Sequence, residues 1–384
     1  MAREQWSMED ADRSEAPVAA PIVAQVADEA TSPPPVTPLA NAVTSEADAL
    51  RDDPESGQAL AQNMLDAGYQ PVILFGNAAS GKTSLILSLL AAIRTDVSLD
   101  TGLFLGEPIL DTTRPYGAFL ANEASRFFGL KTQQFIEGTA ASRTIIDLPF
   151  FIPLLFRPAG KPEARIALME SNGEWYRADR KENKFFPPLR QQIEDFVRSY
   201  PKGIIFIHLL PYTQRHLYRS DTPGGSEAAE LEEASLAVSG ALQAYQSVRS
   251  DKSNDRHLLL VTKWDAHRPP DLDPLDAIND DPEDVARVIA QRYSQAWSTF
   301  VGLNLRSDQM ARNGYCAGQI SGSNIIKAGP ADERGEQMRR YPKGLWRWLY
   351  RNTLELADTT PVDPFPSVLP GRFGWISRLL HRLF

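Results

Sequence analysis

The sequence predicts an α/β fold in which a mostly parallel, twisted sheet is covered by helices on both faces. Short apolar stretches typical of buried strands alternate with longer stretches of helical pattern. A glycine-rich segment also stands between the first predicted strand and the first long predicted helix. Strands that alternate with helices form mostly parallel sheets, because each connecting helix returns across a face of the sheet.

The individual elements follow from local patterns. Residues 70–75 form a short apolar run, and residues 82–93 repeat Leu or Ile every four positions, which predicts a strand and then a helix. Two β-rich runs, 144–157 and 165–170, flank a Pro-Ala-Gly-Lys-Pro-Glu spacer that is typical of a hairpin turn. The later expected elements are strand 203–210, helix 227–248, strand 257–261, helix 284–300, strand 315–320 and helix 337–356.

Composition divides the chain into four segments. Residues 1–58 are rich in Pro, Ala and acids and poor in large apolar side chains, so they are expected to be a disordered acidic tail. Three arginines against twelve carboxylates in this tail account for the whole net charge of −9. The globular domain is expected at 59–357, with an insertion at about 95–138. A linker with four prolines (358–371) and a short amphipathic basic helix (372–384) follow.

Several classes of protein are disfavoured by the whole-chain composition. Cys316 is the single cysteine, so no intrachain disulfide can form, which is typical of the reducing cytoplasm. The N-terminus has no apolar stretch of the signal-peptide kind, and the longest apolar run (145–156) is too broken to span a bilayer. No basic stripe indicates nucleic-acid binding, and the five histidines lack zinc-ligand spacing. We therefore expect a cytoplasmic protein.

The segment Gly-Asn-Ala-Ala-Ser-Gly-Lys-Thr at 76–83 matches the phosphate-loop pattern G-x-x-x-x-G-K-[ST]. Its glycines let backbone N–H groups approach phosphates, its lysine reaches the β- and γ-phosphates, and its threonine hydroxyl ligates Mg²⁺. The flanking strand and helix are the context that this motif requires, so a P-loop NTPase domain is expected. The predicted phosphate-binding residues are Gly76, Asn77, Ala78, Ala79, Ser80, Gly81, Lys82, Thr83 and Ser84.

A second motif, Thr262-Lys263-Trp264-Asp265, follows the buried strand at 257–261. The Asp265 carboxylate can accept two hydrogen bonds from guanine N1–H and N2–H₂, a pair of donors that adenine lacks. The Lys263 stem can lie along the base plane, and Trp264 is expected to pack as a cover. The bland alternative is a strand end with a solvated Lys and Asp. The order of the two motifs along the chain favours guanine as the base.

Together these motifs resemble the P-loop GTPases of the translation-factor-related and Ras-like class over roughly residues 70–357. The string Glu-Ser-Asn-Gly-Glu-Trp and the insertion are most similar to the bacterial double-GTPase-like branch. The resemblance implies a last base contact in the loop after the final strand, where Ser321 and Gly322 stand.

The resemblance also implies an Asp-x-x-Gly motif after the third strand, but here the acid is Glu170 and the glycine is Gly173. Glu170 would act on Mg²⁺ through a carboxylate one methylene longer, and the Gly173 N–H would contact the γ-phosphate. Glu174 stands where many relatives carry a glutamine that orients water. It would be a catalytic residue, with a structural or ion-pairing role as the alternative.

The family further requires a threonine that closes over Mg²⁺ and the γ-phosphate. Thr139 is preferred to Thr144 because it lies in a loop-like segment just before the strand. Arg114 and Arg143 are candidates for an arginine finger supplied by the chain itself, although solvated or ion-paired arginines are commoner.

These residues imply a GTP- and GDP-binding, Mg²⁺-dependent GTPase that hydrolyses GTP slowly and acts as a switch on a protein effector. Lys82, Thr139 and Glu174 would be its catalytic residues. A non-hydrolysing, GTP-dependent assembly module and an ATPase remain as alternatives. Residues 372–384 could pack on their own domain, dock on a partner or lie at a membrane surface, and a homodimer is left open.

Overall fold

The fold comes from a computed structural model that describes residues 57–77, 80–95, 101–137, 150–171, 191–212, 227–264, 282–303, 314–319 and 333–365. All of these residues belong to one unit of the chain, Leu50–Phe384. Of the expected tail (1–58), residues 1–56 lie outside the described residues, whereas residues 57 and 58 belong to a helix, so the tail prediction was wrong for them. The expected amphipathic helix 372–384 also lies outside the described residues.

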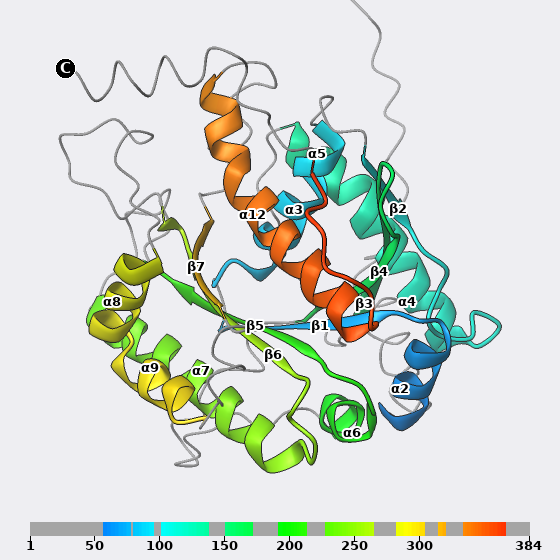
Figure 1. The fold of residues 1–384 in the computed structure, drawn as a ribbon. Coiled ribbons are helices and arrows are strands. Elements are labelled where there is room, and N and C mark those ends of the chain that lie inside the picture. Colours follow the sequence, from blue (N-terminus) through cyan, green and yellow to red (C-terminus); the bar gives the residue numbers. More distant parts are fainter. Residues whose placement is uncertain are drawn as a thin grey trace, which may run out of the picture. The chain divides into compact units, whose positions relative to one another are not determined.

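The described residues contain a seven-stranded sheet in the order β2-β3-β4-β1-β5-β6-β7 (Figure 1). Strands β4, β1, β5, β6 and β7 run parallel, whereas β3 pairs antiparallel with both β2 and β4, so the sheet is mixed. The strands are β1 Gln70–Phe75, β2 Thr101–Leu105, β3 Phe150–Pro158, β4 Ala164–Glu170, β5 Ile205–Pro211, β6 Arg256–Thr262 and β7 Gly314–Gln319.

The predicted hairpin is confirmed as β3 and β4. Phe150 at the start of β3 faces Glu170 at the end of β4, and Phe156 faces Ala164 next to the turn. This register places the first residue of β3 beside the last residue of β4, at the end of the sheet where β1 also ends.

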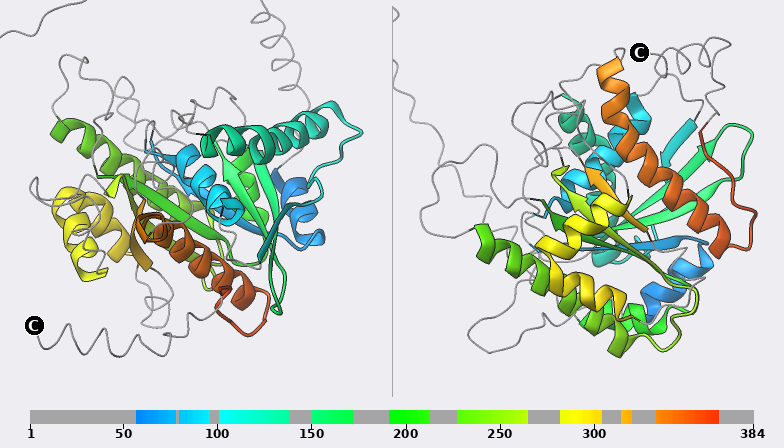
Figure 2. Two further views of the ribbon diagram at one scale, coloured as in Figure 1. Left: turned by 90° about the horizontal axis from the view of Figure 1, so that it is seen from above. Right: turned by 60° about the vertical axis from the view of Figure 1, so that its left-hand side comes forward.

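Helices cover both faces of the sheet, and successive residues of β1 show the two layers (Figures 1 and 2). Val72 and Leu74 join a core formed with α3, α4 and α12, whereas Ile73 and Phe75 join a core formed with α2, α6 and α7. The helices are α2 Gly57–Asp66, α3 Lys82–Thr95, α4 Pro115–Arg126, the π-helix η1 Phe127–Lys131, α5 Thr132–Ile136, α6 Gln191–Ser199, α7 Glu227–Val248, α8 Pro282–Arg292, α9 Ser294–Val301 and α12 Glu333–Leu356.

The helix expected over 284–300 is two helices, α8 and α9, which meet at Tyr293. Tyr293 has a non-helical backbone (φ −132°, ψ 47°) and a wholly buried ring whose hydroxyl donates to the Pro211 carbonyl. Ser235 of α7 accepts a hydrogen bond from the Ala296 N–H (3.1 Å) near the start of α9. Burial of the tyrosine and this contact from α7 account for a break that the helical pattern did not indicate.

The insertion contains regular structure that the sequence did not predict. It supplies the edge strand β2 and the helical stretch α4–η1–α5, which packs over the same face of the sheet as α3. The segment predicted as a linker is also anchored at its start. Phe365 is buried and packs edge-on against Phe156, while Lys161 donates to its carbonyl oxygen (3.0 Å).

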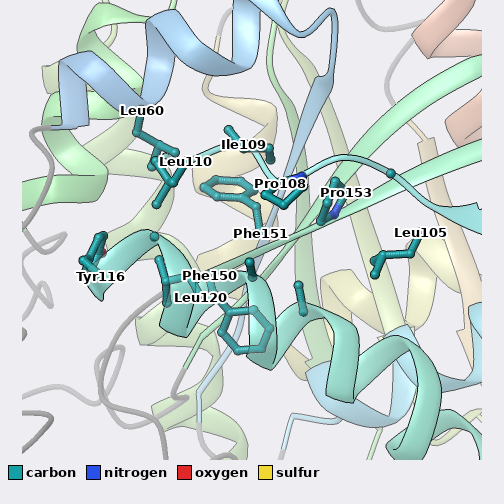
Figure 3. Close-up of a pocket in the computed structure, with 14 residues that line it drawn as sticks. Leu60, Leu105, Pro108, Ile109, Leu110, Tyr116, Leu120, Phe150, Phe151 and Pro153 are labelled. Atoms are coloured by element: carbon teal, nitrogen blue, oxygen red, sulfur yellow. The ribbon is translucent and has the colours of Figure 1, made fainter. Parts of the chain in front are cut away.

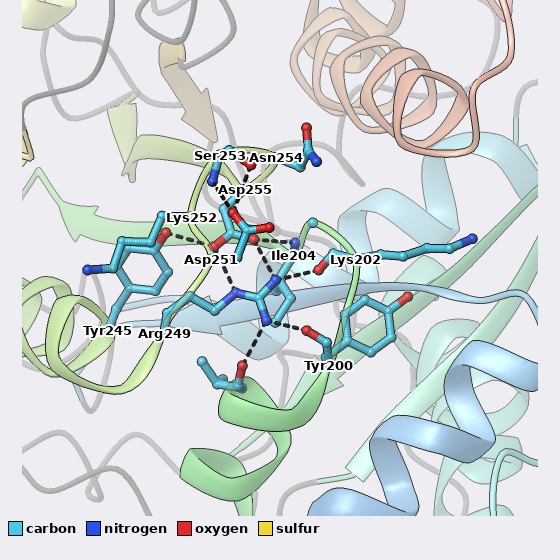
Figure 4. A network of polar contacts seen from close by, with 12 residues as sticks. Tyr200, Lys202, Ile204, Tyr245, Arg249, Asp251, Lys252, Ser253, Asn254 and Asp255 are labelled. Atoms are coloured by element: carbon cyan, nitrogen blue, oxygen red, sulfur yellow. Dashed lines mark hydrogen bonds and ion pairs between the residues drawn. The ribbon is translucent and has the colours of Figure 1, made fainter.

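The end of the sheet opposite the carboxyl end of β1 is held by a buried ion pair (Figure 4). The Arg249 guanidinium contacts the Asp255 carboxylate at 3.0 Å, and both side chains are almost wholly buried. Asp255 also accepts hydrogen bonds from the Tyr245 hydroxyl and the Ile204 N–H, each 2.7 Å long. Arg249 donates as well to the carbonyl oxygens of Val197, Tyr200 and Lys202. Burial raises the pKa of the Asp255 carboxyl, and the positive charge of Arg249 opposes that rise.

Candidate functional site

The segment 76–83, called here the glycine loop, connects the carboxyl end of β1 to the first turn of α3. Gly81 has φ +94°, a left-handed conformation that side chains rarely adopt. A Cβ on Gly76 would lie 2.4 Å from Ser80 Oγ, so that position also requires glycine. Glycine is therefore favoured at Gly81 by the backbone conformation and at Gly76 by the close approach of the Ser80 and Leu209 side chains.

Lys82 is the cation of the loop. Its ammonium donates to the Gly76 carbonyl (2.5 Å) and the Asn77 carbonyl (3.2 Å), and the side chain is buried. Burial lowers the pKa of Lys82 to about 8, and the negative charge of Glu170 opposes this effect. The lysine thus lies folded against its own loop, with its charge inside the curve of the backbone.

Thr83 and Glu170 meet beside the loop. The Thr83 hydroxyl donates to Glu170 Oε1 at 2.7 Å, and Glu170 is wholly buried at the end of β4. Strands β4 and β1 are parallel neighbours, so their carboxyl ends lie at the same edge of the sheet. Two of the three predicted metal residues are therefore in direct contact, while Thr139 lies outside the described residues.

The second motif also reaches the glycine loop. The Thr262 hydroxyl donates to the Ser80 carbonyl at 2.7 Å, and Thr262 Cβ lies 3.6 Å from the position of a Cβ on Gly81. Lys263, the next residue, has φ +55°, and the register of β6 with β7 shifts between Val261 and Thr262. A left-handed lysine next to a strand irregularity is the kind of strain that clusters at functional sites.

Trp264 differs from its expected role as a cover. It is wholly buried in a core with α7, α8 and α9, where its ring meets Tyr212 edge-on at 5.9 Å. The Arg292 guanidinium lies over the Tyr212 ring, 4.3 Å from its centroid. The indole therefore anchors the motif to α7, α8 and α9.

The loop contains two buried polar side-chain atoms without a hydrogen bond to the described residues. Asn77 Oδ1 and Ser80 Oγ are buried, and neither has a hydrogen-bond partner among the described residues. Because buried polar atoms are normally hydrogen-bonded, two such atoms on one short loop point to a polar occupant. Ser84, the remaining predicted residue of this region, lies half-buried in the first turn of α3.

The structure thus brings together the described parts of both motifs and the end of β4. Strand β1 lies between β4 and β5, and the chain passes from one side of β1 to the other between these two strands. Open α/β sheets bind ligands outside the carboxyl ends of the strands at such a point. The remaining predicted site residues fall outside the described residues: Ala78, Ala79, Gly173, Glu174, Asp265, Ser321 and Gly322.

Lys131 is a residue near this site that the sequence did not single out. It ends the π-helix η1 in the insertion, and the negative charge of Glu170 acts on it. A lone lysine in a segment without a predicted element carries no sequence signal. Only the π-helix, which sequence periodicity does not reveal, would have pointed to it.

The structure also has an apolar cavity of about 50 Å³ between α2, α4 and β3 (Figure 3). Leu60, Tyr116, Leu120 and Phe151 are among the side chains that line it, and the glycine loop contributes none of its lining residues. Its apolar lining is typical of a small packing defect, and the cavity is separate from the polar site at the end of β1.

No protein-family model and no curated protein matches this sequence. The described part of the chain shows no group of three or more His, Cys, Asp or Glu side chains that could hold a metal ion. None of the helices in the described ranges combines the length and the apolar character that crossing a bilayer requires.

Proposed function

We propose that this protein is a P-loop GTPase: it binds GTP and GDP with Mg²⁺ at the glycine loop, hydrolyses GTP slowly and acts as a switch on a protein partner. The observation that carries the proposal is the convergence of Lys82, the Thr83–Glu170 pair and Thr262 on one loop at the carboxyl end of β1.

The loop suits a phosphate chain for physical reasons. A left-handed Gly81 and a Gly76 without room for a Cβ let the backbone curl tightly at the start of α3. Backbone N–H groups at a helix N-terminus, together with one fixed cation, attract phosphate. The depressed pKa of Lys82, about 8, reflects a buried charge, and a bound polyphosphate would favour its protonated form.

The donor set at Thr83 and Glu170 also suits Mg²⁺. A hydroxyl and a carboxylate oxygen 2.7 Å apart are hard oxygen ligands of the kind that this ion prefers. When bound, Mg²⁺ would neutralise charge on the phosphate oxygens. In that state Thr83 would orient its hydroxyl toward the metal, with Glu170 as the acceptor that fixes the hydroxyl proton.

The guanine preference of the proposal is supported by the position of the second motif. Thr262 joins the motif to the glycine loop, and left-handed Lys263 with buried Trp264 turns the chain sharply before Asp265. A base held here would lie next to a triphosphate held by the loop, and the Asp265 carboxylate would read guanine N1–H and N2–H₂.

Nucleotide affinity tests the proposal. The purified chain should bind GTP and GDP in the presence of Mg²⁺, with ATP at least about 100-fold weaker. Lys82→Met should abolish binding of all three nucleotides, because the loop loses its fixed cation. Asp265→Asn should weaken GTP and favour xanthosine triphosphate, since its amide matches the exchanged edge of xanthine. Equal affinity for ATP and GTP would overturn the guanine assignment, and the absence of any nucleotide binding would overturn the function.

The second candidate is a GTP-dependent assembly module without turnover. It is favoured by Glu170, which replaces the aspartate of the related motif and is wholly buried against Thr83. Phosphate release separates the two. Steady release of phosphate that Lys82→Met removes supports the GTPase, whereas GTP binding without release supports the assembly module.

A further inference from the structure

The helical stretch of the insertion contains a π-helix at its centre. Helices α4, η1 and α5 follow one another without a break, and the residues at the η1 boundaries, Arg126 and Thr132, both have helical backbone angles. The buried Thr132 hydroxyl donates to the Phe127 carbonyl at 3.0 Å, across the wide turn. π-Helices are rare, and those that occur are often found at functional sites.

The residue at the end of this turn is Lys131. Its ammonium lies 5.0 Å from the centroid of the Phe127 ring. Phe127 is wholly buried and meets Phe150 edge-on at 6.1 Å, and Phe150 faces Glu170 across the β3–β4 ladder. These contacts form a short path from Lys131 to the carboxyl end of β4.

Helix α5, which follows Lys131 directly, packs against α3, the helix that begins in the glycine loop. Figure 1 shows the two helices side by side above the sheet. Lys131 thus lies on the α3 face of the sheet, where its aromatic contact and the helix that continues from it hold it.

Among the described residues at this edge, positive charges outnumber negative ones. Burial lowers the pKa of Lys131, while the charges of Glu123 and Glu170 oppose the fall. Glu170 acts in the same way on Lys82, and Glu123 is paired with Arg126 at 3.6 Å, so Lys82 and Lys131 share the one remaining carboxylate among these residues. Within the described part of the chain no carboxylate forms an ion pair with Lys131. An excess of positive charge beside a glycine loop favours an additional anion.

We propose that Lys131 is a second phosphate-binding cation, which the insertion supplies to the terminal phosphate of the bound nucleoside triphosphate. The inference rests on the proposed function, and it adds a sensor: contact with Lys131 would couple η1 and α5 to the presence of that phosphate. Arg114, a sequence candidate for such a role, stands instead at the N-terminus of α4, at the far end of the same helical stretch.

The test compares the affinities for GTPγS and GDP, each with Mg²⁺, in the full chain and its variants. Lys131→Met should weaken GTPγS at least tenfold and GDP less than twofold, because GDP lacks the terminal phosphate. Lys131→Arg should keep most of the GTPγS affinity. The matched control is Arg126→Met, which removes a positive charge from an exposed side chain in the preceding turn that is paired with Glu123 at 3.6 Å. It should change neither affinity.

A purely structural lysine would give a different pattern. If Lys131 only offsets the buried charge of Glu170, Lys131→Met would lower the melting temperature and weaken both nucleotides equally, which would overturn the inference. Unchanged GTPγS affinity would overturn it as well, while leaving the proposed function intact. A wild-type chain that binds neither nucleotide would overturn both.

Hydrogen exchange gives a second readout. Amides of residues 127–136 should exchange more slowly with GTPγS than with GDP in the wild-type chain. This difference should disappear in Lys131→Met, even at nucleotide concentrations that saturate the variant. Equal protection by both nucleotides in the wild-type chain would contradict the sensor.

Discussion

Thr83 and Thr262 each hold the glycine loop in place through a hydrogen bond from the side-chain hydroxyl. Each hydroxyl donates a hydrogen bond of 2.7 Å, one to the Glu170 carboxylate and the other to the Ser80 carbonyl. Both contacts join residues that are far apart in sequence. The loop is therefore fixed by the ends of β4 and β6 as well as by its own turn, and this lowers the entropy cost of ordering it around a ligand.

Gly81 offers a test of the loop backbone at the scale of one residue. A Cβ on Gly81 would lie at an ordinary contact distance from Thr262, 3.6 Å, so the cost of Gly81→Ala comes from φ +94°. We expect a loss of about 1–2 kcal/mol of folding stability and a marked loss of nucleotide affinity, measured by chemical denaturation and by GTP titration.

The matched control for Gly81→Ala is Gly160→Ala. Gly160 has φ +66° in the β3–β4 turn, and a Cβ there would meet no atom within 4 Å. This variant should lose a similar amount of stability and bind GTP as the wild-type chain does. If both variants bind GTP equally well, the conformation of Gly81 does not matter for the ligand.

The sequence predicted some site residues and missed others for physical reasons. Lys82 and Thr83 belong to a motif whose spacing fixes their place on a strand–loop–helix unit, so local sequence is sufficient. Trp264 was assigned to the wrong environment, because its burial depends on α7, α8 and α9, which pack on β6 from elsewhere in the chain. The position of Lys131 depends on the π-helix η1 and on the register of β3 with β4, and neither feature has a local sequence pattern.

At the scale of elements, segments with a clear local pattern were predictable, whereas the elements of the insertion were not. Strand β6 carries a continuous apolar pattern, and α12 carries a helical one in spite of Pro342 in its interior. Both lie close to where the sequence placed them. The insertion consists of a five-residue strand and a helix whose pattern is altered by η1, so no period extends far enough to be recognised.

Helix α12 gives a prediction on how one element is fixed to the domain. The Trp346 ring stacks on Phe156 of β3 at 4.7 Å, and its indole N–H donates to the Leu89 carbonyl of α3 at 2.9 Å. Trp346→Ala should lower the free energy of unfolding by about 3–5 kcal/mol, because it leaves a large cavity between α12, α3 and β3.

Trp348, two residues along the same helix, is the control for that measurement. It is half-buried at the edge of the same core, so Trp348→Ala should cost about 1 kcal/mol. Equal losses for the two variants in urea denaturation would mean that α12 is not held through Trp346.

At the scale of the whole molecule, the two ends of the sheet differ in how far their buried polar groups are hydrogen-bonded. The carboxyl end of β1 leads into a loop with buried polar atoms that have no hydrogen bond to the described residues, whereas the opposite end is closed by the Arg249–Asp255 pair and its carbonyl contacts. The alternation of strands and helices predicted a mostly parallel sheet. It could not predict the strand order, since pairing joins residues across the whole chain.

Two histidines in the middle of this sheet predict how the whole molecule responds to acid. His208 of β5 and His257 of β6 are wholly buried, stacked at 5.5 Å, with their ring nitrogens 3.2 Å apart. Burial lowers the pKa of His208 to about 3. The pKa of His257 also lies well below its usual value, because of burial and the charge of His208.

The sign of the effect follows from these depressed pKa values. Above pH 6.5 both histidines are neutral in the folded and unfolded chains, so their contribution to stability is complete. Below pH 6.5 only the unfolded chain takes up protons, so stability falls with pH until the folded pKa is reached. The loss should approach about 1.4 kcal/mol per pH unit for each histidine.

Urea denaturation at pH 7, 6 and 5 measures this loss, and comparison with a histidine variant separates it from the titration of carboxylates such as Asp255, whose pKa burial raises. His208→Phe should make the dependence on pH shallower by close to one proton, because one of the two buried bases is gone while Phe75, stacked on His208 at 5.6 Å, keeps an aromatic neighbour. An unchanged slope in that variant would show that the acid response arises outside the β5–β6 pair. A flat wild-type curve would show that the imidazoles are reached by protons without unfolding.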